Sequence, residues 1–293
     1  MKLSIITVNL NNLDGLRKTM DSVKMQQFID FEFLVVDGNS IDGSVDLICN
    51  SANLPHGITK ASNVKWFTST STIQGAFVSE ADTGVFQAMN KGIRMAKGEY
   101  LLFLNSGDFF VDENVLSDVF SIDYSADLLC ASCKITKQGK LVYVTAPQDT
   151  YTFISLYKQG INHQSTFIKR ELFDKLGMYR EDFKYNSDWE FFIRAIILNN
   201  CSTKKVDRIV CDYNLDGVST TQSTTPLFCQ EIEIVFSNPL LKKFIPDYEL
   251  WFKERDEMVP LKWIESQTYL YKPLYMYYKL ACYLVKIKNR IIT

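Results

Sequence analysis

Apolar and polar positions over the first hundred residues follow two different periods. Residues 3–10 (LSIITVNL), 31–38 (FEFLVVDG) and 100–104 (YLLFL) are short, nearly continuous apolar runs, as is typical of strands buried on both faces. Residues 13–25 and 85–97 instead carry apolar side chains at helical spacing. This alternation predicts an α/β fold with a Rossmann-like, mostly parallel central sheet flanked by helices.

Weaker patterns predict the remaining elements. Residues 126–147 are expected to form a hairpin, because Gln138-Gly139 is a favoured turn between two apolar runs. The polar stretch 51–75 is predicted to be a loop with one short strand near VKWF, and residues 77–84 are predicted to be a loop. Further expected elements are a helix from Ser40 or Asp42 to Cys49, a strand over 163–169, a short helix over 170–177 and a longer helix over 187–199.

Polar clusters follow three of the predicted strands, at Thr7 to Asn9, Asp37 to Ser40 and Asn105 to Asp108. The carboxyl ends of parallel strands meet at one edge of a sheet, so these clusters are expected to line a single cleft. Asp37 can accept hydrogen bonds from a pyrimidine imide or from ribose hydroxyls. Asp108, at a glycine turn, is expected to be exposed enough to bind a divalent cation. Water and the substrate diphosphate would complete the coordination shell of that cation. The alternative is that both aspartates only cap helices or turns.

Two later segments carry further candidates. Residues 79–92 (SEADTGVFQAMNKG) predict a turn at Asp82, followed by a helix with Asn90 and Lys91 facing the same cleft. Lys91 either pairs with a phosphate or with Asp37, or it is a solvated surface lysine.

Asp188 is predicted to lie in the first turn of a buried helix, where the helix dipole favours a carboxylate and an aromatic neighbour partly desolvates it. It is therefore placed for general base work. Glu190 is expected to form a structural ion pair with Arg194, four residues later. His163 either lies in the cleft or is a structural hydrogen-bonding residue, and residues 217–220 form either a loop over the site or a linker.

Composition narrows the classes of protein. The chain has 293 residues, of which 46% are hydrophobic, and its 32 basic and 34 acidic side chains give no overall field that would favour nucleic acid. Neither a P-loop nor a GxGxxG pattern occurs. Seven scattered cysteines indicate reduced thiols in a cytoplasmic setting, with Cys130 and Cys133 packed inside a strand. We find no signal-peptide pattern and no apolar run long enough for a membrane span.

The last part of the chain has a different pattern. Lys272, Lys279 and Lys286 recur every seventh residue among tyrosines and apolar residues, which predicts a helix with a basic face and an aromatic face over 267–293. Such a helix either lies on an anionic membrane surface, joins copies of the chain into a homo-oligomer, or docks on its own domain. We therefore expect a catalytic domain over 1–220 and a C-terminal helical extension over 221–293.

Seven segments resemble glycosyltransferase family 2, the inverting enzymes with the GT-A fold, and particularly the bacterial polysaccharide branch related to colanic-acid glycosyltransferases. They are, in family order, SIITVNLNN, VVDGNSIDGS, SEADTGVFQAMNKG, LLFLNSGD, NHQSTF, NSDWEF and DGVST. The resemblance spans residues 1–220. It implies a nucleotide-sugar donor, usually of uridine, Mn²⁺ or Mg²⁺ as the cofactor, and a glycan acceptor on a lipid carrier or a protein. The enzyme would be cytoplasmic, with peripheral contact at the inner face of the membrane.

The resemblance also implies roles for individual residues. NSGD stands where the family has its DxD metal motif, but Asn105 and Gly107 leave Asp108 as its only carboxylate. Asp188 stands where the family has its general base. The donor-binding residues expected on this basis are Thr7, Asn9, Asp37, Asn39, Asp82, Asn90, Lys91, Asn105, Ser106 and Gly107, and the acceptor-binding residues are His163, Gln164, Trp189 and Ser219.

Two other functions compete with this reading. A nucleotidyltransferase has a similar nucleotide-binding half, but it normally carries a glycine-rich basic loop near its amino terminus, which this chain lacks. A non-catalytic nucleotide-sugar-binding scaffold would be compatible with the loss of carboxylates from NSGD.

Overall fold

The computed structural model describes residues 1–51, 65–68, 74–158, 160–215 and 225–250. It divides into two compact units, residues 1–233 and 234–293, and the first unit contains the whole described sheet. Ser219 and the helix predicted over 267–293 lie outside the described residues. Among the helices that are described, none combines the length and the hydropathy needed to cross a bilayer.

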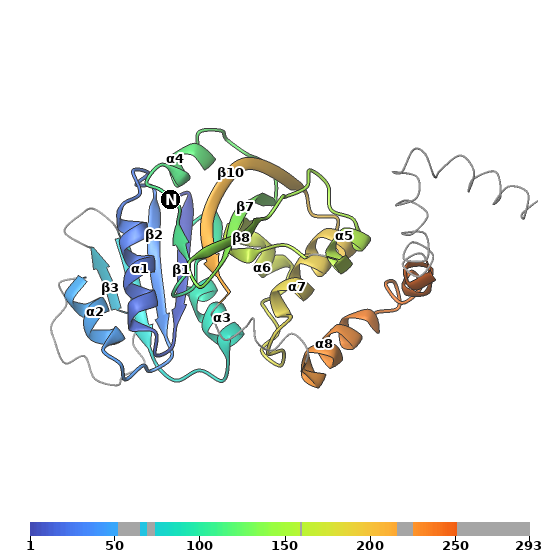
Figure 1. Cartoon of the computed structure of the whole chain (residues 1–293), viewed down its shortest axis with the longest axis horizontal. Coiled ribbons are helices and arrows are strands. Elements are labelled where there is room, and N and C mark those ends of the chain that lie inside the picture. Colours follow the sequence, from blue (N-terminus) through green and yellow to red (C-terminus); the bar gives the residue numbers. More distant parts are fainter. Residues whose placement is uncertain (52–64, 69–73, 159, 216–224, 251–293) are drawn as a thin grey trace, which may run out of the picture. The chain divides into compact units, whose positions relative to one another are not determined.

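Ten strands form one sheet in the described part of the chain, in the order β3-β4-β2-β1-β5-β9-β7-β10-β6, with β8 paired to β7 (Figure 1). Strands β4, β2, β1 and β5 are parallel neighbours, whereas the second half of the sheet is mixed. The strands are β1 (Leu3–Asn9), β2 (Phe31–Asp37), β3 (Lys65–Thr68), β4 (Gln74–Ser79), β5 (Tyr100–Phe103), β6 (Phe109–Phe110), β7 (Leu128–Lys137), β8 (Lys140–Val144), β9 (Thr166–Lys169) and β10 (Thr203–Asn214).

The helices lie on both faces of this sheet. Leu16, Met20 and Val23 of α1 pack with α2 and α4 against one face, in a core that extends to β7 and β10. Helix α3 covers the other face, where Gly92 lets it approach Ile6 so closely that a Cβ atom would clash. The helices are α1 (Leu13–Lys24), α2 (Ser44–Ser51), α3 (Val85–Met95), α4 (Val115–Val119), α5 (Phe153–Lys158), α6 (Glu171–Leu176), α7 (Ser187–Phe192), which continues as a π-helix (Ile193–Leu198), and α8 (Pro226–Phe236).

An aromatic cluster joins α6 and α7 to the sheet. Phe173 stacks on Phe191 with their ring centroids 4.4 Å apart, and both contact Tyr179. Phe103, at the end of β5, packs edge-on against Phe173. Because stacked and edge-on aromatic pairs hold their partners in defined orientations, this cluster fixes α7 relative to the end of β5.

Most predicted elements are confirmed, and several differ. The strand predicted over 163–169 begins only at Thr166, after a 3₁₀ turn over His163–Ser165. The strands at residues 3, 31 and 100 are present, and the 138–139 turn is left-handed, with φ of 49° at Gln138 and 71° at Gly139. Residues 74–79 were predicted to be loop but form β4. Their Gly and Ala residues give a weak strand pattern in the sequence, whereas pairing with β2 on one side and β3 on the other makes the segment a strand. The charged strand β10 was not anticipated. It pairs with β7 in parallel, but β9 is antiparallel to both β5 and β7 and β6 is antiparallel to β10, so the second half of the sheet is mixed.

Candidate active site

A row of hydrogen-bonded polar side chains lies at the carboxyl ends of β1, β2 and β4. Asp37 is fully buried, and its carboxylate accepts hydrogen bonds from the Asn9 amide at 2.8 Å, the Ser40 N–H at 2.9 Å and the Ser79 hydroxyl at 2.7 Å. The Asn9 Oδ1 atom is buried and has no hydrogen-bond partner among the described residues. Buried acceptors are normally paired, so this oxygen is free to accept an N–H or O–H group from a ligand.

Two other predicted donor contacts lie beside this row. Thr7 is fully buried and its hydroxyl donates to the Leu104 carbonyl at 2.6 Å, which ties β1 to the end of β5. Asn39 is exposed and has a left-handed backbone, with φ of 66°. Thr7 therefore supports the strand end, while Asn39 lies on the loop that follows β2.

The 105–108 turn is held in place by helix α1. The Thr19 hydroxyl donates to the Asp108 carbonyl at 2.6 Å and accepts the Gly107 N–H at 3.0 Å, and the Asn12 amide donates to the Ser106 carbonyl at 2.9 Å. Gly107 has φ of 107°, which disfavours any residue with a side chain. Sequence reasoning missed Thr19, whose only signal is a hydroxyl on the buried face of an amphipathic helix.

Asp108 is buried, with 5% of its surface exposed, so the expectation that it would be well exposed is wrong. Burial raises the pKa of its carboxyl from 3.8 to about 7, while His163 and the backbone N–H of Asn214 oppose the rise and Asp212 adds to it. The charged form of this carboxylate is therefore poorly compensated by the protein alone. A cation would relieve that penalty.

His163 connects the 105–108 turn to helix α7. Its Nδ1 atom lies 2.6 Å from Oδ2 of Asp188, and its Nε2 atom lies 3.4 Å from the side-chain nitrogen of Asn105. With Asp188 ionised, this geometry assigns the proton to Nδ1, so that His163 donates to Asp188 and accepts from Asn105. The second carboxylate oxygen of Asp188 accepts the Trp189 N–H at 2.9 Å.

Backbone contacts join these groups into one edge of the sheet. Ser106 N–H donates to the Val8 carbonyl at 3.1 Å, and Gly38 N–H donates to the Asn9 carbonyl at 2.8 Å. The strand-end clusters are thus neighbours, and His163 links them to Asp188. The structure brings these predicted residues together, while their individual roles stay predictions.

Lys91 pairs with partners other than those considered from the sequence. Its ammonium group lies 2.7 Å from Glu80 and 2.6 Å from Asp82, and not on Asp37. Burial raises the pKa of Asp82 although Lys91 opposes the rise. Burial alone would lower the pKa of Lys91, but its hydrogen bonds to the two carboxylates outweigh that effect and raise it. Lys91 is therefore a neutralised cation, and a phosphate would have to displace a carboxylate to bind it.

Three further predicted residues make contacts inside the protein. The Asn90 amide exchanges hydrogen bonds with the backbone of Tyr179, at 2.9 and 3.1 Å. The Trp189 indole donates to the Leu156 carbonyl at 2.9 Å. Gln164 is 5% exposed. A substrate contact by Asn90 would break the bonds that attach α3 to the segment before α7.

Glu231 of α8 holds the segment that leads into α7, and sequence reasoning missed it. Only 1% of its surface is exposed, and its carboxylate accepts backbone N–H groups from Lys184 at 2.5 Å, Tyr185 at 3.1 Å and Asn186 at 2.9 Å. The Asn186 amide adds a fourth hydrogen bond at 2.9 Å. The only signal in the sequence is an acidic residue within the apolar stretch EIEIVF, and nothing there names its partners.

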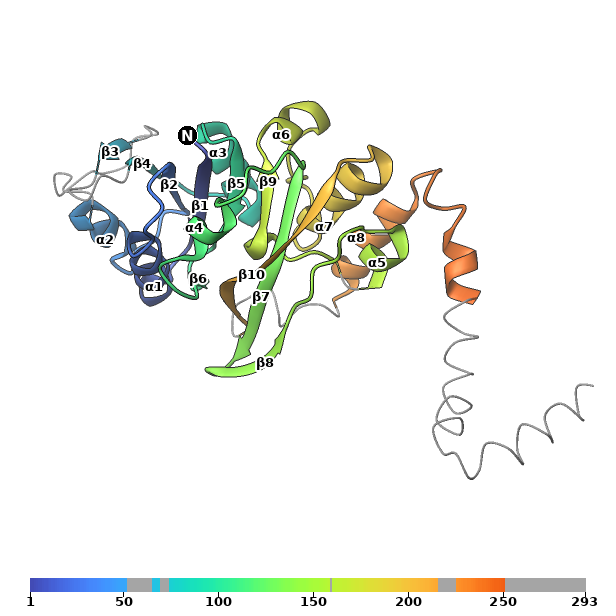
Figure 2. The same ribbon diagram turned by 90° about the horizontal axis from the view of Figure 1, so that it is seen from above.

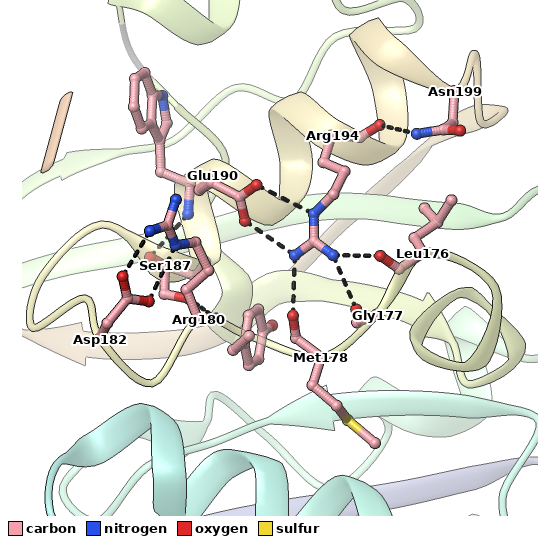
Figure 3. Close-up of polar contacts among 12 residues, drawn as sticks. Leu176, Gly177, Met178, Arg180, Asp182, Ser187, Glu190, Arg194 and Asn199 are labelled. Carbon is pink, nitrogen blue, oxygen red and sulfur yellow. Dashed lines mark hydrogen bonds and ion pairs between the residues drawn. The ribbon is translucent and has the colours of Figure 1, made fainter. Parts of the chain in front are cut away.

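Arg194 clamps the other side of α7 (Figure 3). Its guanidinium group binds both carboxylate oxygens of Glu190, at 3.1 and 2.9 Å, which confirms the predicted ion pair. It also donates to the carbonyls of Leu176, Gly177 and Met178 at the end of α6. One side chain thus satisfies carbonyls that the end of α6 leaves without helical partners.

Arg194→Lys is expected to lower the free energy of unfolding by roughly 2 kcal/mol, because an ammonium group cannot replace the bidentate pair and also reach the carbonyls. Arg180→Lys is the matched control. Arg180 pairs with the single exposed carboxylate of Asp182 in the same region (Figure 3), so its replacement should cost at most about 0.5 kcal/mol. Urea unfolding followed by circular dichroism compares them, and equal losses would contradict the clamp.

The residues around Asp108 are compatible with a divalent cation that the protein holds only in part. No group of three His, Cys, Asp or Glu side chains in the described ranges could enclose a metal ion. Asp108 supplies one poorly compensated carboxylate, and the buried Oδ1 of Asn105 has no hydrogen-bond partner in the described part of the chain. Magnesium-type sites often use one or two carboxylates and leave the other positions to water and substrate phosphates. Asp108 and Asn105 fit such a site.

Comparisons with known proteins find similar chains among glycosyltransferases. The family model described as "Glycosyl transferase family 2" matches residues 4–70, which include β1, β2 and the Asp37 cluster. An uncharacterized glycosyltransferase of Mycobacterium tuberculosis is 27% identical over 236 residues, covering 77% of this chain and 80% of that protein. A PGL/p-HBAD biosynthesis glycosyltransferase of Mycobacterium bovis is 28% identical over 228 residues, covering 74% and 79%.

Solved structures share the fold at low sequence identity. The structure of Staphylococcus aureus TarS 1–349 in complex with UDP-GlcNAc has a TM-score of 0.57 and 18% identity; the match covers 77% of this chain but only 62% of that one, less than two thirds. The mannosyltransferase PcManGT from Pyrobaculum calidifontis, in complex with GDP-Man and Mn²⁺, has a TM-score of 0.56 and 16% identity, covering 97% and 85%. These neighbours are GT-A glycosyltransferases, so the expected fold is confirmed. The family model and the curated relatives show that the chain is similar to glycosyltransferases of family 2, and they support the resemblance seen in its sequence.

Proposed function

We propose that this protein transfers a sugar from a nucleoside diphosphate donor, most suitably a UDP-sugar, to a hydroxyl group of a bacterial glycan acceptor, with inversion at the anomeric carbon. The observation that carries the proposal is the link from the 105–108 turn through His163 to Asp188, next to the buried Asn9–Asp37 row. This link puts the 105–108 turn, which would bind the leaving diphosphate, and Asp188, which would deprotonate the acceptor, at the same edge of the sheet.

The donor base would bind at the ends of β1 and β2. Asn9 Oδ1 is a buried acceptor without a partner, which suits the imide N–H of uracil. Asp37 orients this amide by accepting from its nitrogen, and Ser40 and Ser79 hold the carboxylate in turn. Asp37 thus acts chiefly by positioning Asn9, since its own side chain is fully buried.

The diphosphate would lie beside Asp108 and Asn105, the two residues that would hold Mn²⁺ or Mg²⁺. When bound, such a cation supplies positive charge to the diphosphate, whose negative charge grows as the glycosidic bond breaks. The left-handed Gly107 keeps the turn free of a side chain where substrate oxygens would approach. Structural neighbours that contain GDP-Man with Mn²⁺ or UDP-GlcNAc support a nucleotide-sugar donor and a divalent cation.

Asp188 would take the proton from the acceptor hydroxyl. The acceptor oxygen forms its bond to the anomeric carbon as the bond from that carbon to the diphosphate breaks, the proton passes to Asp188, and the nucleoside diphosphate leaves. A single displacement of this kind inverts the anomeric centre. His163 fixes the orientation of the Asp188 carboxylate through the 2.6 Å contact and leaves lone pairs on both oxygens for the acceptor proton.

The proposal is tested by following nucleotide release from a panel of UDP- and GDP-sugars with Mn²⁺, in the presence of candidate glycan acceptors. We expect turnover with at least one donor and an inverted product by NMR. Binding of a nucleotide sugar without any turnover would favour the scaffold, and transfer of a nucleotidyl group would favour the nucleotidyltransferase.

His163→Ala is expected to lower kcat by about 30-fold and to change KM for the donor less, since it removes the 2.6 Å contact that positions the base and only a long 3.4 Å contact to Asn105. The double variant with Asp188→Asn should be no slower than Asp188→Asn alone, because the two residues act as one unit. Additive losses in this double-mutant cycle would contradict the coupling of His163 to Asp188.

A further inference from the structure

The β7–β8 hairpin carries an unusual amount of exposed apolar surface. Every residue of β8 is exposed, and Leu141, Val142 and Tyr143 retain 58%, 55% and 51% of their accessible surface. Figure 2 shows the hairpin extending beyond the helices of the first unit. A strand normally buries at least one face, so a run of apolar residues exposed on both faces indicates a surface that another body covers.

The hairpin itself carries only basic charge, although Asp212 of the neighbouring strand β10 pairs in register with Lys134. Residues 128–148 contain three lysines, Lys134, Lys137 and Lys140, and no acidic residue. Lys137 and Lys140 are exposed and face each other across the turn. Apolar side chains next to exposed lysines are the combination that an anionic lipid surface attracts, because the lysines meet the head groups while the apolar side chains enter the interface.

The hairpin also begins beside the candidate active site. Lys134, Ile135 and Thr136 of β7 pair with the end of β10, and the backbone N–H of Asn214 in that strand hydrogen-bonds to the Asp108 carboxylate. A surface bound at the hairpin would therefore lie near the end of β10 that contacts Asp108.

We propose that the β7–β8 hairpin is a membrane-docking element that binds anionic lipid head groups. It inserts Leu141, Val142 and Tyr143 into the interface while Lys137 and Lys140 contact phosphates. A second copy of the chain is a poorer occupant, because residues 128–148 of that copy would offer no acidic side chain to compensate the lysines. The inference does not depend on sugar transfer, but it would bring an acceptor carried on a lipid to the site.

The test is sedimentation of the full-length protein with vesicles of phosphatidylcholine, with and without phosphatidylglycerol. We expect binding only when phosphatidylglycerol is present, and weaker binding as salt is raised. Lys137→Gln with Lys140→Gln should lower the partition coefficient by about 25-fold, at roughly fivefold for each lysine. Leu141→Ser with Val142→Ser should weaken binding without altering its salt dependence.

Lys24→Gln with Ile29→Ser is the matched control, because it removes an exposed lysine and an exposed apolar residue at the end of α1 and in the following loop. This control should bind as the wild type does, and thermal unfolding should show that all variants are folded. Wild-type binding by the hairpin variants, equal binding to neutral vesicles, or a dimer in solution that the hairpin variants dissociate would each overturn the proposal. The vesicle experiment uses no nucleotide sugar. A negative result would therefore count against membrane docking and not against the proposed sugar transfer.

Discussion

Asp188→Asn is expected to lower kcat by about 10³-fold while leaving KM for the donor and the midpoint of thermal unfolding nearly unchanged. Asparagine has the same shape as aspartate, and its amide oxygen still accepts the His163 Nδ1–H that the carboxylate accepts at 2.6 Å. It cannot take a proton from the acceptor hydroxyl. The loss should therefore appear in the chemical step, which single-turnover measurement of transfer isolates.

The control for this prediction is Asp182→Asn. Asp182 lies six residues before Asp188 but is exposed and pairs only with Arg180, so its replacement should leave transfer within about twofold of the wild type. Release of nucleotide from the donor by water, without acceptor, should also survive better than transfer in Asp188→Asn. Wild-type transfer by Asp188→Asn would remove Asp188 as the base.

Asp108→Asn is expected to lower transfer by about 100-fold and yet to make the protein more stable at pH 8. The pKa of Asp108 is about 7 in the folded protein against an ordinary value of 3.8, so the folded state holds this proton more tightly than the unfolded state. The contribution of Asp108 to the free energy of unfolding is therefore greatest below pH 3.8, falls as the pH rises toward 7, and stays low above pH 7. Asparagine carries no charge and avoids that loss.

The measurement is the midpoint of thermal unfolding at pH 5 and at pH 8, with and without Mn²⁺. Without metal, Asp108→Asn should exceed the wild type by roughly 5 °C at pH 8 and by less at pH 5. Mn²⁺ should raise the midpoint of the wild type at pH 8, less so at pH 5 where a proton competes for the carboxylate, and should not raise that of the variant. A variant that is less stable at pH 8, or that still responds to Mn²⁺, would contradict the role of Asp108.

The parts of the fold that the sequence predicted are those with a strong local signal. The strands that begin at Leu3, Phe31 and Tyr100 are apolar runs ended by polar residues, and their parallel order follows from the helices between them. Strand β4 has Gly75 and Ala76 at its centre and is a strand only because β2 and β3 pair with it. Strand β10 contains five charged residues, without a regular strand pattern, and takes its place from its pairing with β7.

The site shows the same division between local and long-range information. That Asn9 and Asp37 are neighbours could be derived, because parallel strands bring their ends together. The contact between His163 and Asp188 joins residues 25 positions apart and depends on how α7 packs, which no local pattern records. The burial of Asp108 depends in the same way on β10, whose N–H at Asn214 lies against its carboxylate.

The pairing of Lys91 illustrates why charge in a sequence is hard to interpret. From the sequence, Asp37 and a phosphate were both reasonable partners, whereas the structure places Glu80 and Asp82 nearer. All three carboxylates lie within one region, and only distances decide among them. Glu231 is similar, since four hydrogen bonds to one buried carboxylate require a loop that the sequence does not position.

The most direct test of this account is a crystal structure of the protein with a non-hydrolysable UDP-sugar and Mn²⁺, using the anomalous signal of manganese to locate the metal. We predict a manganese peak at the Asp108 carboxylate, the uracil at Asn9 beside Asp37, and the sugar between the 105–108 turn and Asp188. A nucleotide bound elsewhere, such as the hollow lined by Cys130, Tyr143 and Tyr151, or a metal away from Asp108, would contradict the account.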